Sequence, residues 1–132
     1  MADGIGGGTV RVAKVTLTAA QVQALVTTPI TLVPAPGAGM IVSILSATAY
    51  IDYNSAAYTT GADILIEYGT ATIVTFDGIL ALTADTVMVA SQSGSTAVAG
   101  ASNAAVLITA DDVPGDGNSP VTVSVVYTLI SL

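Results

Sequence analysis

The chain has 132 residues, of which 52% are hydrophobic and only 8% charged, and its formal net charge at pH 7 is −7. It has two basic residues, Arg11 and Lys14, too few to form the cationic surface that phosphate binding requires. It has no histidine and no cysteine, which excludes the usual general bases, catalytic triads, disulfides and thiolate metal sites. We therefore expect a domain that is not an enzyme, needs no cofactor and binds no nucleic acid.

The mean hydropathy of +0.80 is high for a soluble protein. A membrane-spanning helix needs about 20 consecutive apolar residues, and serines and threonines interrupt every apolar run before that length. Ordinary soluble domains carry about 25% charged residues, far more than this chain does. Because obligate interfaces resemble a domain core, the composition predicts an obligate homo-oligomer whose surfaces are covered by neighbours, with no membrane partner.

The N-terminal residues 1–9 include four glycines and predict a flexible arm, followed by a β-sandwich domain over residues 10–132. Two interpretations of the arm remain open. It is either a frayed terminus, which is the more common case, or a segment that orders on a neighbouring subunit with Ile5 as its apolar anchor.

Residues 10–17 alternate in polarity and predict a strand that contains both basic residues. Arg11 and Lys14 lie an odd number of positions apart, so a regular strand places them on opposite faces and they form no basic patch. At an interface, Arg11 could bind a carboxylate through two parallel hydrogen bonds. The following Thr-Ala-Ala-Gln, residues 18–21, fits a capping box and predicts a helix of about two turns that ends before Pro29.

Two strands, over residues 30–33 and 40–53, are predicted on either side of a stiff turn. In that turn Pro36 suits the first corner, because its ring fixes φ, and Gly37 suits the second, because it tolerates positive φ. Residues 40–53 are apolar on both faces, which indicates a central strand or one covered by another subunit.

Turn signals divide the rest of the chain into further strands. Residues 79–83 fit either a helical turn or a strand, and residues 92–102 predict a flexible loop. The further strands are expected over residues 62–68, 70–76, 86–91, 103–109 and 121–132. Eight strands and one short helix predict an all-β fold, a β-sandwich or jelly roll.

Two groups of residues are candidate sites. Tyr58 lies in a loop of small residues, where it fits an interface contact or a lid over the edge of the core, and both interpretations remain open. Asp111, Asp112 and Asp116 could supply oxygen ligands to calcium. Their spacing does not match the EF-hand pattern, and Asp beside Gly and Pro is typical of turns, so a turn is the favoured interpretation.

Several segments carry a resemblance to a known family. They are Thr-Ala-Ala-Gln at 18–21, Pro-Ile-Thr-Leu-Val-Pro-Ala-Pro-Gly-Ala-Gly at 29–39, the strand ending Ile-Asp-Tyr at 51–53, Tyr-Gly at 68–69 and Gly-Asp-Gly at 115–117. With these the chain resembles the head decoration, or cement, proteins of tailed bacteriophages. A lysine often follows the Gly-Ala-Gly turn in that family, whereas this chain has Met40.

The resemblance implies a structural virion protein, assembled in the host cytoplasm, that binds the outer surface of a phage head as a trimer. Its partners would be further copies of itself and the major capsid protein, whose contacts it would stabilise. Two alternatives remain: a phage tail or fibre component built on a trimeric β-sandwich, and a carbohydrate-binding module. The second lacks the stacked aromatics that such modules usually need, since the chain has five tyrosines and no tryptophan.

Overall fold

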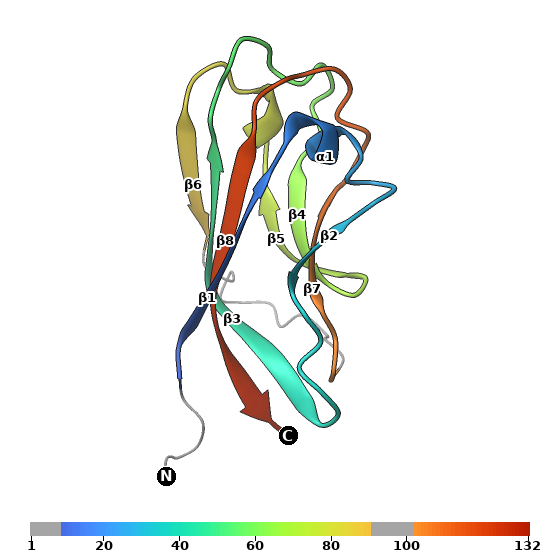
Figure 1. Cartoon of the computed structure of the whole chain (residues 1–132), viewed down its shortest axis with the longest axis vertical. Helices are drawn as coiled ribbons and strands as arrows, with labels where there is room; N and C mark the ends of the chain where they lie inside the picture. The colour runs from blue at the N-terminus through green and yellow to red at the C-terminus, as the bar shows by residue number, and fades with distance from the viewer. Residues whose placement is uncertain (1–8, 91–101) are drawn as a thin grey trace.

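The computed structural model describes residues 9–90 and 102–132, and in these ranges the protein is a β-sandwich with one short α-helix (Figure 1). The predicted anchor Ile5 and most of the predicted flexible loop lie outside the described residues. The elements are β1 (Arg11–Leu17), α1 (Ala19–Gln23), β2 (Ile30–Val33), β3 (Met40–Ile51), β4 (Ile64–Tyr68), β5 (Ala71–Phe76), a 3-10 turn η1 (Ile79–Ala81), β6 (Thr86–Ala90), β7 (Val106–Ala110) and β8 (Val121–Ser131).

The strands form two four-stranded antiparallel sheets, in the orders β1-β8-β3-β6 and β2-β7-β4-β5. The first strand pairs with the eighth, the second with the seventh, the third with the sixth and the fourth with the fifth. This is the pairing of one long antiparallel hairpin rolled into two layers, as in a jelly roll. The predicted all-β, jelly-roll-like sandwich is confirmed.

The core between the two sheets is aliphatic. In the first half of β8 the alternate residues Val121, Val123 and Val125 are fully buried, as the regular alternation of this segment predicts, and the second half is half-buried or exposed. The longest strand, β3, departs from a simple alternation, because a β-bulge shifts its register with β8 between Ile44 and Ser46. The bulge turns Leu45 away from the core, so one face of β3 is buried, while on the other face Leu45 is exposed and its neighbours are half-buried.

The helix α1 closes one end of the sandwich and buries Val22. It begins with the predicted capping box: the Thr18 hydroxyl accepts from the Gln21 amide at 3.2 Å, and the Gln21 side chain accepts from the Thr18 amide at 2.9 Å. It is shorter than predicted, because irregular turns replace the second helical turn before Pro29. Within residues 9–90 and 102–132, no helix is long and apolar enough to cross a membrane.

The turn between β2 and β3 also differs from the prediction. The Met40 amide donates to the Gly37 carbonyl at 3.2 Å, so the corners are Ala38 and Gly39 rather than Pro36 and Gly37. Gly39 has a φ of 74°, the value that the second corner of such a turn needs. The side chain of Asn103 fixes this position by accepting from the Gly37 amide at 2.8 Å.

Candidate interaction surface

Acidic side chains gather at the end of the sandwich closed by α1, the upper end in Figure 1. The loops there, after β3, β5 and β7 and before β4 and β6, carry seven of the nine carboxylates of the chain: Asp52, Asp63, Asp77, Asp85, Asp111, Asp112 and Asp116. We call this the acidic end. The described loops at the opposite end, residues 34–39, 69–70 and 102–105, carry no charged side chain.

Several of these carboxylates hold the loops of the acidic end together. Asp63 accepts from the Gly78 amide at 2.8 Å, Asp85 from the Tyr53 amide at 2.8 Å, and Asp111 from the Asp63 amide at 2.7 Å. Each bond satisfies a backbone group that no strand pairs, which is the usual role of Asp in turns.

Of the three predicted calcium candidates, Asp111 and Asp112 accept hydrogen bonds through their carboxylates, whereas Asp116 bonds to Thr59 through its backbone. Asp111 accepts from the amide of Asp63, which directly precedes β4, and Asp112 accepts from the neighbouring Val113 amide at 2.8 Å. Among residues 9–90 and 102–132, no group of three or more acidic side chains is arranged to hold a metal ion. The hydrogen bonds correspond to the turn interpretation of this segment.

Tyr58 lies inside the protein, with only 3% of its surface exposed, and its hydroxyl donates to the Ser119 carbonyl at 2.6 Å. The Tyr58 side chain is thus buried in the single chain, which corresponds to the lid interpretation. Burial raises the pKa of Tyr58 to about 12. Gly117 packs against the ring so closely that a Cβ built there would lie 2.5 Å from a ring carbon.

A second surface stands out because it is aliphatic. Among residues 9–90 and 102–132, nine large hydrophobic side chains are exposed, and the face of the β1-β8-β3-β6 sheet that points away from the core carries six of them. Val12 is 68% exposed and Val89 is 72% exposed. We call this surface the outer face; its exposed aliphatic residues are Val10, Val12, Leu45, Val87, Val89 and Ile130.

The polar residues of the outer face are almost all uncharged. Strand register brings Lys14, Ser124, Thr48 and Val89 into one row across the four strands, and Lys14 is the one charge on the face. Arg11 is exposed at the first position of β1, opposite Tyr127. It lies an odd number of positions from Lys14, so the two residues are on opposite faces of the strand. The two basic residues therefore form no patch, as predicted.

The corresponding face of the other sheet is different in character. None of the large exposed hydrophobic residues lies on β2, β4, β5 or β7. Its exposed positions include Thr31, Thr72 and Thr75, and the Thr72 hydroxyl donates to Glu67 at 3.0 Å. The sandwich thus has one polar face and one aliphatic face. Sequence periodicity had assigned faces to single strands, but it did not indicate which strands lie side by side.

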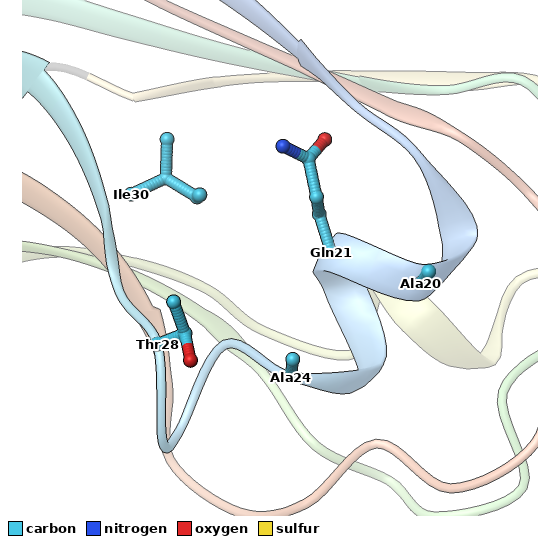
Figure 2. Close-up of a pocket in the computed structure, with 5 residues that line it drawn as sticks. All are labelled: Ala20, Gln21, Ala24, Thr28 and Ile30. Carbon is cyan, nitrogen blue, oxygen red and sulfur yellow. The ribbon is translucent and has the colours of Figure 1, made fainter.

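A small hollow of about 260 Å³ lies beside α1. It is lined by Ala20, Gln21, Ala24, Thr28 and Ile30, and Figure 2 shows the Gln21 amide nitrogen on the Ile30 side, with its oxygen turned toward the chain that enters the helix. The lining has no charged or aromatic side chain, and its polar side-chain groups are the Gln21 amide and the Thr28 hydroxyl.

Comparison with known proteins gives a fold relationship. No family model matches the chain, and no curated protein matches it. Among solved structures, the chain is similar to one described as "Cyanophage Pam1 capsid asymmetric unit", with a TM-score of 0.54 and 18% sequence identity over 97% of this chain and 91% of that one. The jelly-roll-like sandwich of this protein is therefore similar in fold to a chain from a cyanophage capsid.

Proposed function

We propose that this chain is a structural protein of a bacteriophage virion, which decorates the outer surface of the head and stabilises contacts between major capsid subunits. The observation that carries the proposal is the fold similarity, over almost the whole length of both chains, to a chain of a cyanophage capsid asymmetric unit. Jelly rolls are common in viral capsid domains, although a fold alone does not specify a function.

The chemistry of the chain supports a role in assembly rather than catalysis. Without histidine or cysteine it lacks the residues that most often act as catalytic bases and nucleophiles. The protein instead offers an aliphatic outer face and, opposite the acidic end, described loops without charged side chains, both suited to burial against other protein. In the proposed role, each bound copy buries apolar surface across a seam between capsid subunits, and the stabilisation adds up over the shell.

The acidic end gives this role a direction. Carboxylates are costly to bury without partners, so we propose that the acidic end points away from the shell and stays in water. The loops at the opposite end of the sandwich, which include the turn at Gly39, would then lie closer to the capsid surface. The protein would act as a homo-oligomer, and the family resemblance implies a trimer.

The copy number in purified virions tests the proposal. Quantitative mass spectrometry is expected to find the chain in proportion to the major capsid protein, and heads stripped of it are expected to release DNA at a lower temperature. A few copies per particle, co-purifying with tails, would instead identify a tail or fibre component. Absence from virions would overturn both assignments.

A further inference from the structure

We propose that the outer face is the surface through which copies of this chain bind one another. The proposal extends the proposed function by naming the contact that holds the oligomer together. Its occupant is a second copy of the chain rather than the capsid protein, and three properties of the face support this choice.

The first property is charge. Seven of the nine carboxylates lie at the acidic end, and Lys14 is the one charged side chain on the outer face. Asp52 and Asp85 approach this face only at Tyr50, at the edge beside the acidic end, so covering the rest of the face buries no carboxylate and brings no rows of like charges together. A face with so few charges offers little to attract a strongly charged partner by complementary potential, whereas it is compatible with a second copy of the same chain, which is equally poor in charge.

The second property is size. The four strands of this sheet have 7, 11, 12 and 5 residues. With a rise of about 3.3 Å per residue and a spacing of about 4.8 Å between strands, they cover roughly 550 Å² of sheet. A standard interface buries about 800 Å² of accessible surface on each partner. The flat area of the sheet is smaller than this value, but side chains that stand out from the sheet make its accessible area larger than its flat area.

The third property is the contrast within the molecule. Six exposed aliphatic side chains lie on the outer face and none on the corresponding face of the β2-β7-β4-β5 sheet. A free chain would expose these aliphatic side chains from the moment it folds, and apolar surface concentrated on one face and interspersed with polar residues is typical of protein interaction sites. Another copy of the chain is the one partner present wherever the chain is made.

Paired lysine substitutions at the two edges of each sheet test the proposal. Val12→Lys with Val89→Lys charges the edge strands β1 and β6 of the outer face, at positions already exposed to water in the single chain. Thr31→Lys with Thr75→Lys adds the same charge to exposed positions of β2 and β5, the edge strands of the other sheet. The second pair is therefore a matched control.

Analytical ultracentrifugation of the isolated proteins gives the readout. The wild type and the Thr31/Thr75 variant are expected to sediment as the same oligomer, and the Val12/Val89 variant as a monomer with an unchanged far-ultraviolet circular dichroism spectrum. A monomeric wild type, a Val12/Val89 variant that stays assembled, or equal dissociation of the control would overturn the proposal.

A milder pair keeps the test decisive if the lysine variant fails to fold. Val12→Thr with Val89→Thr keeps β-branched side chains, and it is expected to raise the dissociation constant about tenfold or more, because apolar contact is lost on every copy. An unchanged constant would overturn the proposal. These measurements use the isolated chain, so they test self-association separately from the proposed role on the phage head. Self-association can be absent from a chain that is found on heads, and it can be present in a chain that is found on none.

Discussion

The hydroxyl of Tyr68, on β4 of one sheet, donates a hydrogen bond to the carbonyl of Val42, on β3 of the other. It also accepts from the Ile44 amide at 3.3 Å. Among the described residues, β6 pairs with β3 only over Ala47–Ile51, and no other described strand pairs with the first half of β3 on that side. The Tyr68 hydroxyl satisfies two backbone groups there and joins the two layers of the sandwich.

Replacing Tyr68 with Phe is therefore expected to lower the free energy of unfolding by about 1–3 kcal/mol, because two buried backbone groups lose their partner. Urea denaturation measures the change. Tyr127→Phe serves as the control, since no hydrogen bond of the Tyr127 hydroxyl is found among the described residues, and it should change stability much less. Equal effects of the two substitutions would contradict this role of Tyr68.

Gly117→Ala is expected to destabilise the protein by about 1–3 kcal/mol through overpacking. The new Cβ would lie 2.5 Å from the Tyr58 ring and 2.8 Å from the Tyr58 Cα, so the backbones of two loops would have to separate. Gly61→Ala is the matched control, because no atom lies within 4 Å of its Cβ position. Thermal denaturation should show a lower midpoint for the first variant only; a normal midpoint for Gly117→Ala would argue against this packing.

The stability of the protein should fall at alkaline pH. Burial raises the pKa of Tyr58 to about 12, whereas an unfolded tyrosine titrates near pH 10. The folded state therefore holds this proton more tightly, and the stabilisation is complete below about pH 10 and is lost as the pH rises toward about 12.

Urea denaturation across this pH range measures the effect in the wild type and in Tyr58→Phe. The variant is expected to be less stable at neutral pH, since the Ser119 carbonyl loses its hydrogen bond, but to lose less stability at high pH. Burial also raises the pKa of Tyr68, so part of the alkaline loss should remain in the variant. Parallel pH curves for the two proteins would exclude a contribution of Tyr58.

The capping box of α1 provides a local test. Thr18→Ala removes the hydroxyl that accepts from the Gln21 amide and should cost about 1 kcal/mol. Thr18→Ser keeps this acceptor and should restore most of the loss, as measured by urea denaturation. If Ser and Ala behave alike at this position, the cap does not contribute to stability.

The sequence predicted the elements well, because polarity alternates along most strands and glycine, proline and aspartate occur between them. All eight strands were predicted close to their observed bounds. It did not predict the bulge at Leu45, because a shift of one residue leaves no local signal in a segment that is apolar at nearly every position. The corners of the turn at Gly37 were misplaced because several glycines and prolines there satisfy the same turn rules.

Predicting the candidate interaction surface required the tertiary structure more than predicting the strands did. Sequence alone left Tyr58 open between a lid and an interface contact, and the burial of its ring against Gly117 and the Ser119 carbonyl became visible only in the tertiary structure. The outer face was not predicted as a unit, because Val12 and Val89 lie far apart in the chain and meet on one surface only when β8 and β3 pair between them.

The amino-acid sequence by itself determined that this protein is an all-β domain, poor in charge and without histidine or cysteine, because composition and alternation are properties of the chain alone. The tertiary structure decided where the few charges and the exposed aliphatic side chains lie. Strand pairing joins residues that are distant in sequence, and it is this pairing that separates an acidic end from a neutral face.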